Sequence, residues 1–416
     1  MKYMADREID LRRFRPDRPP VVLLGGLNVA RATGLARIPV IVASTDAACP
    51  VFASRHCDSP LLLPPLEQPA AVVETVMRLG ERLANALGCA VPLFYGDDDY
   101  LNLILQNRGR LAQYYRFILN DPEVAAALLD KERFDAFSRS RALPVPRTLE
   151  WEELEAIPGP VLVKPKLKLG FEQSAIFVRL LGRAGKARVF ATPQQVLADP
   201  LARSLRHDLL FQEYIPGDDR QIWSFHGYAD EESRVLAWFT GRKIRTYPAL
   251  TGVSTYLQLA HHDELAAIGQ RIVARTPLKG VFKIDFKQDP RTGQFFMLEV
   301  NARFNLWHYL AAANGLNIPC VAYDYLLHGK VPAAAPRPRS SLRWLSLRLD
   351  YRAYRDLASR GELSLWRWLA SLATSRKVYD VFAWSDPLPL VRYWVRRMHR
   401  VPRVTARLTR WLFTAS

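Results

Sequence analysis

The sequence has few cysteines and no long apolar run. Its 416 residues include four cysteines, Cys49, Cys57, Cys89 and Cys320, with no CxxC pair. Scattered thiols argue against a disulfide scaffold or a structural zinc site and favour a reducing compartment. No apolar segment reaches the roughly 18 residues that a membrane-spanning helix needs, and the charged N-terminal segment MKYMADREIDLRRFRPDRPP does not resemble a secretory signal. We therefore expect a cytoplasmic protein.

The common glycine-rich nucleotide motifs are also missing. No segment matches GxxxxGK[ST], which excludes a P-loop. The turn GGLNVARATG, residues 25–34, departs from GxGxxG, and no acidic residue stands at a convincing ribose-binding position after it. This pattern argues against a nicotinamide cofactor. We interpret the segment as a tight turn between a strand and a helix.

Hydrophobic patterning nevertheless predicts ordered elements along most of the chain. The stretch 20–60 is predicted to be an α/β unit with strands VVLLGG and IPVIVAS around a helix over 28–37, and a helix over 68–87 follows. Beyond residue 160, VLVKPKLK, AIFVRLL, ARVF and DLLFQE are predicted as strands, with a helix over 193–205. QIWSFHGY with VLAWFTGRKIR, and VFKIDFKQDPRTGQFFMLEV, are predicted as two hairpins, separated by a helix over about 262–275.

Polar side chains recur on the two strands of the second hairpin. Glu299, Asn301 and Arg303 alternate with small apolar residues, so they share one face of a strand, and Asp285 occupies the polar face of the preceding strand. If both polar faces coincide, two carboxylates and a carboxamide converge as hard oxygen ligands, which suit Mg²⁺ held together with nucleotide phosphates. A neighbouring arginine would then stabilise a transferring phosphoryl group. The alternative is a surface hairpin with solvated charges.

Two other segments allow a similar pair of interpretations. VLVKPK places Lys164 at the end of an apolar strand, where it could contact phosphates or simply reach solvent. FQEYIPGDD, residues 211–219, could offer backbone groups to an adenine edge and acids to a ribose, or could be an edge strand with its turn.

The order of these segments resembles the ATP-grasp superfamily. DK (130–131), LPVPRT (143–148), VLVKPK, FQEYIPGDD, KIDFK and LEVNAR follow one another as in that superfamily, and GRKIRTYP, TGVSTYLQL and RFNLWHYLAAANGLNIP are similar to its predicted carboxylate–amine ligase group. The resemblance covers about residues 20–330. It implies a mixed α/β and α+β fold, with an N-terminal Rossmann-like pre-ATP-grasp domain (1–125) and an ATP-grasp domain (126–330) whose subdomains, 126–205 and 206–330, clamp ATP.

The resemblance also implies a role for each matching residue. Lys131 and Lys164 would contact ATP phosphates, and Arg303 would stabilise the phosphoryl and acyl-phosphate transition states. The adenine would be held by Glu213, Tyr214 and Ile215, and the ribose by Asp218 or Asp219. The implied Mg²⁺ ligands are Asp285, Glu299 and Asn301, while Arg242 and Arg245 would grip an anionic substrate or the acyl phosphate. The loop 167–175 is poorer in Gly and Ser than in many members, which weakens its expected role as a phosphate lid.

The implied activity is ATP- and Mg²⁺-dependent ligation of a carboxylate to an amine through an acyl phosphate, with an amino acid as one substrate. Substrate specificity is expected in loops around residues 95–110 and 240–256. Two alternatives stay open: an ATP-grasp enzyme that makes a phosphate ester or thioester, and a non-catalytic ATP-binding module at a membrane surface.

The positive charge is concentrated beyond the region of resemblance. After a Pro/Ala linker, residues 337–416 hold 17 Arg and Lys against 5 Asp and Glu, which accounts for most of the net charge of +17. LVRYWVRRMHR (390–400) and RVTARLTRWLF (403–413) predict two short helices with arginines opposite an apolar face. We expect a basic helical extension over 331–416 whose residues 390–413 either dock on an anionic membrane, on its inner face, or pack on the enzyme. Nucleic-acid binding is not predicted, because no recognition fold accompanies the charge.

Overall fold

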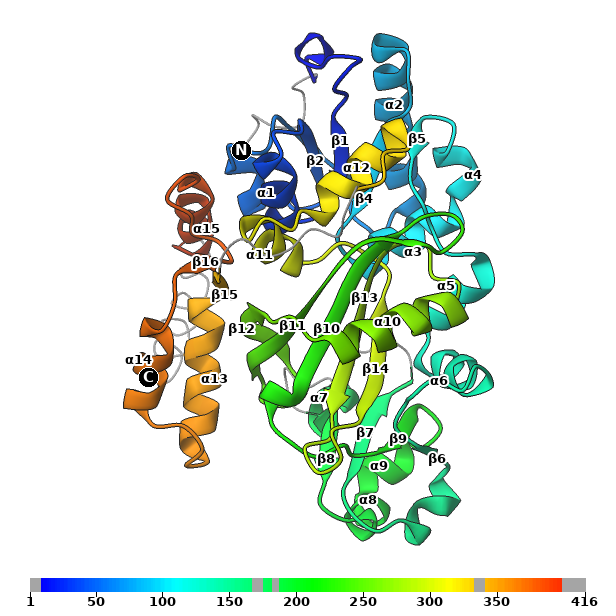
Figure 1. The fold of residues 1–416 in the computed structure, drawn as a ribbon, viewed down its shortest axis with the longest axis vertical. Helices are drawn as coiled ribbons and strands as arrows, with labels where there is room; N and C mark the ends of the chain where they lie inside the picture. Colours follow the sequence, from blue (N-terminus) through cyan, green and yellow to red (C-terminus); the bar gives the residue numbers. More distant parts are fainter. Residues whose placement is uncertain (1–8, 167–174, 182–186, 333–340, 399–416) are drawn as a thin grey trace, which may run out of the picture.

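The computed structural model describes residues 9–166, 175–181, 187–332 and 341–398 (Figure 1). The second predicted tail helix, over 403–413, and nearly all of the expected phosphate lid lie outside these residues. The described chain forms three sheets that follow one another in sequence, so the predicted order of α/β and α+β regions is confirmed.

The N-terminal part is a five-stranded parallel sheet in the order β3-β2-β1-β4-β5. Its strands are β1 (Val21–Leu24), β2 (Val40–Ser44), β3 (Ser59–Leu62), β4 (Val91–Tyr95) and β5 (Tyr115–Arg116), and its main helices are α1 (Leu27–Leu35), α2 (Pro69–Leu87), α3 (Asp98–Gln106) and α4 (Arg108–Leu111). All of β1 is buried, as the continuous apolar sequence VVLL predicts for a central parallel strand. The predicted α/β unit at 20–60 is thus confirmed.

A four-stranded sheet in the order β6-β9-β7-β8 forms the next layer. Its strands are β6 (Thr148–Leu149), β7 (Val161–Pro165), β8 (Arg188–Phe190) and β9 (Leu209–Glu213), and the helices are α5 (Pro122–Leu129), α6 (Lys131–Ser140), α7 (Ala175–Leu181), α8 (Pro193–Ala198) and α9 (Pro200–Ser204). Two predictions are wrong here. AIFVRLL is helix α7, because a short apolar run fits a helix as well as a strand, and the helix over 193–205 is divided before Pro200, whose ring disfavours a helical residue ahead of it.

The third sheet has seven strands in the order β14-β13-β10-β11-β12-β15-β16. Both predicted hairpins are present in it, as β10 (Ile222–Ala229) with β11 (Val235–Tyr247) and as β13 (Gly280–Gln288) with β14 (Phe295–Asn301); β12 is Val253–Leu259. Helices α10 (Asp263–Arg275), α11 (Trp307–Ala313) and α12 (Ile318–His328) complete this part. Phe282, Ile284 and Phe286 are fully buried, so the opposite face of β13 carries the polar residues, as predicted.

The C-terminal extension is more firmly joined to the fold than a basic helical tail would be. Its strands β15 (Arg343–Leu345) and β16 (Lys377–Tyr379) lengthen the seven-stranded sheet, because β15 pairs with β12. Its helices α13 (Leu347–Ser359) and α14 (Leu365–Ala373) lie beside that edge, while α15 (Leu388–Met398) lies near α1 (Figure 1). No helix of the described residues combines the length and apolar character of a membrane span.

Candidate active site

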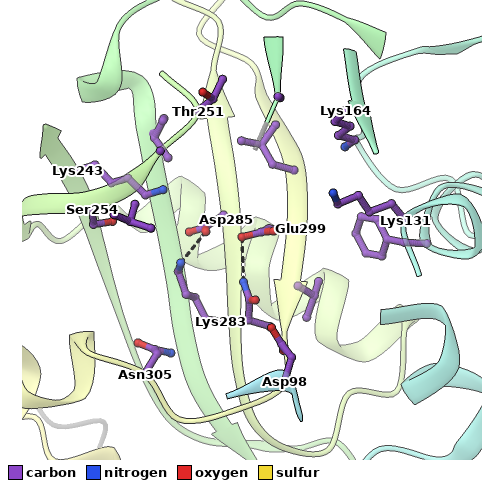
Figure 2. A pocket seen from close by; sticks show the side chains of 18 of the residues that line it. Asp98, Lys131, Lys164, Lys243, Thr251, Ser254, Lys283, Asp285, Glu299 and Asn305 are labelled. Carbon is purple, nitrogen blue, oxygen red and sulfur yellow. Dashed lines mark hydrogen bonds and ion pairs between the residues drawn. The ribbon is translucent and has the colours of Figure 1, made fainter. Parts of the chain in front are cut away.

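The predicted phosphate and metal residues line a cavity of about 380 Å³ between the three sheets. The N-terminal sheet contributes Asp98, the four-stranded sheet with its helices contributes Lys131 and Lys164, and the seven-stranded sheet contributes the carboxylates of the second hairpin (Figure 2). The cavity therefore gathers residues that are up to about two hundred positions apart in the chain.

Asp285 and Glu299 stand directly opposite each other on β13 and β14. The Glu299 carboxylate accepts a hydrogen bond from the Asn301 side chain at 3.1 Å, and Asp285 lies 2.6 Å from the Lys283 ammonium. Asp285 also accepts a hydrogen bond from the buried Ser224 hydroxyl. The two polar faces of the hairpin therefore coincide, as predicted. Two carboxylates and an amide oxygen fit Mg²⁺, which takes few protein ligands and completes its shell with water and phosphate oxygens.

Lys131 and Lys164 lie across the cavity from these carboxylates (Figure 2). Lys131 donates a hydrogen bond to the carbonyl oxygen of Pro165 at 3.0 Å, which ties α6 to β7. Burial lowers the pKa of Lys164 to about 8, although the negative charges of Glu299 and Asp135 favour its protonated form. Both lysines come from short, well-packed elements, so their ammonium groups are aimed at the cavity without a flexible loop.

Arg303 follows β14 and reaches the N-terminal sheet. Its Nε donates to Oδ1 of Asp98 at 2.9 Å, at the start of α3. The neighbouring amide of Phe304 donates to the carbonyl of Tyr95, at the end of β4. The prediction missed Asp98 as a site residue. The available signal was VPLFYGDDD, a buried strand that ends in acids, because the carboxyl ends of parallel strands commonly carry binding residues in such sheets.

Leu162, Gln212, Ile222 and Leu298 form a mostly apolar part of the cavity beside Lys164. The residues predicted to hold adenine and ribose, Glu213, Tyr214, Ile215 and Asp218, lie next to this part of the described chain but are not among those that line it. Backbone N–H groups of Glu213 and Tyr214 already donate to Arg147 and Pro160. Their nucleotide contacts therefore stay predictions.

The structure contradicts the prediction that Asp219 binds the ribose. Its side chain is 5% exposed and accepts hydrogen bonds from the backbone amides of Thr246 (2.6 Å) and Leu250 (2.9 Å) and from the Thr246 hydroxyl (2.8 Å). These bonds saturate the carboxylate within the protein. Asp219 shapes the segment after β11, and of the two acids only Asp218, which is exposed and paired with Arg220, stays a ribose candidate.

Arg242 and Arg245 are also corrections, because neither lines the described cavity. Arg242 lies over the Trp223 ring, 5.6 Å from its centre, on the other face of the sheet. Arg245 is 6% exposed and its guanidinium is 2.7 Å from the Asp350 carboxylate. The cation that β11 presents to the cavity is Lys243. Alternation places Lys243 on the face opposite Arg242, and the register irregularity after Lys243 interrupts the alternation before Arg245.

Known proteins resemble this chain in sequence or in fold. No protein-family model matches the sequence. The chain is 23% identical over 272 residues to a D-aspartate ligase of Enterococcus faecium (strain Aus0004), a match that covers 62% of this chain and 63% of that protein. The chain thus spans less than two thirds of that relative's length.

Several solved structures share the fold. An N5-carboxyaminoimidazole synthetase of Staphylococcus aureus complexed with ADP matches with a TM-score of 0.58 and 12% identity, covering 82% of this chain and 83% of that one. A biotin carboxylase–β,γ-ATP complex of Campylobacter jejuni matches with a TM-score of 0.56 and 12% identity, covering 78% and 74%. An L-amino acid ligase of Bacillus licheniformis matches with 0.52 and 12%, covering 77% and 75%. At this identity the likeness shows the fold.

Proposed function

We propose that this chain is an ATP-grasp enzyme, an ATP- and Mg²⁺-dependent ligase that joins a carboxylate to an amine through an acyl phosphate. The observation that carries the proposal is the cavity itself, where Asp285 and Glu299 face Lys131 and Lys164. Asn301, bonded to Glu299, and Arg303 line the same cavity. A metal-ligand set opposite two cations suits the transfer of a phosphoryl group, whose charge must be neutralised from several sides.

The nucleotide would lie with its base in the apolar part of the cavity and its phosphates between the lysines and the carboxylates. Asp285, Glu299 and Asn301 would hold Mg²⁺, which would supply positive charge to neutralise the phosphates. Relatives with related folds were crystallised with ADP or a β,γ-ATP complex, which supports ATP as the nucleotide of this chain.

The chemistry needs activation because the leaving group of a free carboxylate would be oxide. A carboxylate oxygen attacks the γ-phosphorus and ADP leaves, which gives an acyl phosphate. The amine nitrogen then attacks the acyl carbon, inorganic phosphate leaves with the carboxylate's oxygen, and the nitrogen loses a proton. Lys164 and Arg303 would hold the anions together in the first step and stabilise the departing phosphate in the second.

An amino acid is proposed as one substrate. The support is the names of two similar proteins, a D-aspartate ligase and an L-amino acid ligase. Two competing enzymatic outcomes differ in chemistry. A thioester would form from the same acyl phosphate when a thiol attacks the acyl carbon and phosphate leaves, whereas a phosphate ester would form when a hydroxyl oxygen attacks the γ-phosphorus directly and ADP leaves.

The test is mass spectrometry of products after incubation with ATP, Mg²⁺, pooled D- and L-amino acids and pooled amines. We expect ADP, phosphate and a new mass equal to acid plus amine minus water, and none of these with Glu299→Ala. A stable acyl or alkyl phosphate without amide would identify a kinase instead. ATP binding without ADP release across the whole panel would favour the non-catalytic module.

We further propose that the extension docks on an anionic membrane surface. In the described part of α15, the arginine side of the helix contacts the protein and the apolar side is exposed. An amphipathic helix that packs on a protein normally does the opposite. Arg396 pairs with Asp46 at 2.8 Å and Arg392 donates to the carbonyl of Ala47, so the arginine side faces the N-terminal sheet. The apolar side faces outward, with Val391, Trp394 and Met398 exposed by 56%, 51% and 61%. Exposed apolar side chains on this scale mark interaction surfaces.

Lipid is the occupant that this surface suits, because an exposed tryptophan partitions at the interface and five further arginines, besides the two that contact the protein, lie between residues 397 and 410 of the sequence. The test is co-sedimentation of full-length protein with vesicles of phosphatidylglycerol and phosphatidylcholine. Replacing both Val391 and Trp394 by Ser should abolish pelleting, while Leu35→Ser, an exposed leucine on α1, should not. Equal pelleting of both variants, or no pelleting of the native protein, would overturn docking. Truncation at Ser385 is unsuitable because it removes Asp386, which is buried against Arg31.

A further inference from the structure

Asp350, in the C-terminal extension, is a fully buried carboxylate with four hydrogen-bond donors. Arg245 donates through Nε and Nη2 at 2.8 and 2.7 Å, the Thr255 hydroxyl donates at 2.8 Å and the Trp368 indole N–H at 2.8 Å. A buried charge satisfied in this way fixes the position of every group that contacts it. Asp350 therefore joins α13 and α14 rigidly to β11 and β12.

The groups fixed by Asp350 flank one wall of the active-site cavity. This wall, called here the β11–β12 wall, consists of Lys243 and residues 250–254, all of which line the cavity. Arg245 follows Lys243 by two residues and Thr255 directly follows Ser254. The extension also holds the middle of the connection, since Asp356 accepts a hydrogen bond from the Ala249 amide at 3.3 Å.

The β11–β12 wall contains a tight turn at Gly252, where the backbone leaves no room for a side chain. A Cβ atom on Gly252 would lie 2.0 Å from the carbonyl carbon of Tyr247, so a side chain there would displace the turn. The Gly252 amide donates to the carbonyl of Pro248 at 2.9 Å, which closes that turn. The wall is therefore a fixed surface whose position depends on Asp219 from one side and on the extension from the other.

The chemistry of the wall is that of an oxyanion site. Lys243, Thr251 and Ser254 bring an ammonium group and two hydroxyls to the cavity, on the side opposite Lys131 and Lys164 and close to Asp285 (Figure 2). Within the described residues, Lys243 makes no hydrogen bond or ion pair. A cation that the described part of the chain leaves without an ion pair, at a site of this polarity, is available to a ligand's negative oxygens.

We propose that the β11–β12 wall binds the terminal phosphoryl group, and that Asp350 is a positioning residue for it, so that the C-terminal extension is part of the catalytic unit. The inference rests on the proposed function in that the nucleotide is ATP. The phosphoryl group would lie between the wall and the two lysines, next to the metal ligands, where its transfer to an acid must occur.

The first test is calorimetric titration with Mg²⁺-bound AMPPNP, which has a γ-phosphoryl group, and with Mg²⁺-bound ADP, which lacks one. We expect Lys243→Met to weaken AMPPNP binding by tenfold or more and to change ADP binding by less than twofold. Arg242→Met is the matched control on the opposite face of the same strand and should change neither. Equal weakening of both nucleotides by Lys243→Met, or no weakening of either, would overturn the assignment.

The second test separates positioning from stability. Asp350→Asn is compared with Asp386→Asn, which removes the extension's other buried carboxylate, bonded to Arg31 at 2.9 Å and to Ser54 and Arg55. We expect both variants to melt at lower temperature and only Asp350→Asn to lose AMPPNP affinity selectively. Thr255→Val, which removes one donor to Asp350, should show a smaller selective loss if Asp350→Asn does not fold. AMPPNP affinities that match the native protein in the Asp350 and Thr255 variants would overturn the positioning role.

These titrations contain neither acid nor amine, so they remain decisive if the ligase proposal fails. Absence of any C–N product with normal, wall-dependent AMPPNP binding would reject the ligase and keep the wall. If the C–N product forms and the Lys243 and Asp350 variants bind AMPPNP like the native protein, the ligase proposal is kept and the role of the wall is rejected.

Discussion

Arg303 and Asp98 are 205 positions apart in the chain, and their side chains meet at 2.9 Å in the cavity. The pair joins the metal-binding hairpin to the N-terminal sheet, so the substrate side of the cavity is built from two parts of the molecule. It also turns the guanidinium of Arg303 in a defined direction, since a carboxylate fixes the fork geometry of an arginine.

Removing Asp98 should impair turnover without impairing the fold. Asp98→Ala leaves the Arg303 guanidinium free to rotate, and misplacement of a catalytic charge by about 1 Å can cost about a hundredfold in rate. We expect kcat to fall by at least about tenfold while Mg²⁺-ADP affinity stays unchanged. Steady-state kinetics and calorimetry measure these effects, and unchanged kcat would remove Asp98 from the site.

Loss of a metal ligand should be more severe. Glu299→Ala removes one of the two carboxylates that face the phosphate region, and a lost metal ligand costs on the order of several kcal/mol of charge stabilisation. We expect ADP release to be abolished while circular dichroism shows a native fold. Glu232→Ala, an exposed acid in the turn between β10 and β11, is the control. Normal turnover by folded Glu299→Ala protein would reject the metal site.

Lys164 predicts a pH dependence of nucleotide binding. Because burial lowers its pKa to about 8, below the ordinary value for lysine, the ammonium group loses its proton as pH rises through about 8. Phosphate affinity should therefore be highest below pH 8 and fall above it, with a midpoint displaced upward by bound phosphate. Mg²⁺-AMPPNP affinity measured from pH 6.5 to 9.5 tests this. Lys164→Arg should flatten the profile, and an unaltered slope in that variant would contradict the assignment.

Lys166 is the matched control for Lys164. The two lysines share strand parity, but Lys166 is paired with Glu132 at 2.8 Å at the surface and is not among the described residues that line the cavity. An exposed ion pair contributes only about 0–1 kcal/mol. Lys166→Ala should therefore bind nucleotide like the native protein, whereas Lys164→Ala should bind it much more weakly. The opposite result would show that the register of β7 against the nucleotide is shifted by two residues.

Arg245 should matter for stability. Arg245→Met leaves Asp350 buried without its main partner, and breaking one side of a buried ion pair typically costs about 3–5 kcal/mol. Arg242→Met, on the accessible side of the sheet, should cost less than about 1 kcal/mol. Urea denaturation of both variants measures the difference. Equal stabilities would contradict the burial of the Arg245–Asp350 pair.

The sequence was most informative where alternation is regular and least informative where packing decides. In the second hairpin, Glu299, Asn301 and Arg303 alternate with apolar residues and Asp285 alternates with Phe282, Ile284 and Phe286, so the convergence of Asp285 with Glu299 could be predicted from residue types. The register shift between Asp285 and Phe286 leaves that pair opposite each other. The strand β11 could not be treated the same way, because its register is irregular between Lys243, which lines the cavity, and Arg245, which pairs with Asp350 of the extension. No local sequence pattern predicts this irregularity in the register of β11.

The extension shows the second limit. Its arginines and apolar residues predicted an amphipathic helix, and α15 is one. Which side faces the protein depends on partners distant in sequence, Asp46 and Ala47 among them. Strands β15 and β16 are three residues each and take their stability from the edge of an existing sheet, so no isolated reading of 343–345 or 377–379 predicts them.

The most direct test of the central claim follows one oxygen atom. The acid substrate found in the product screen is labelled with ¹⁸O in its carboxylate and incubated with ATP, Mg²⁺ and the amine. An acyl-phosphate route transfers one labelled oxygen from the carboxylate to inorganic phosphate, because the C–O bond breaks when the amine attacks. We expect ¹⁸O-labelled phosphate in amounts equal to the amide formed. Amide formed with unlabelled phosphate would contradict the account.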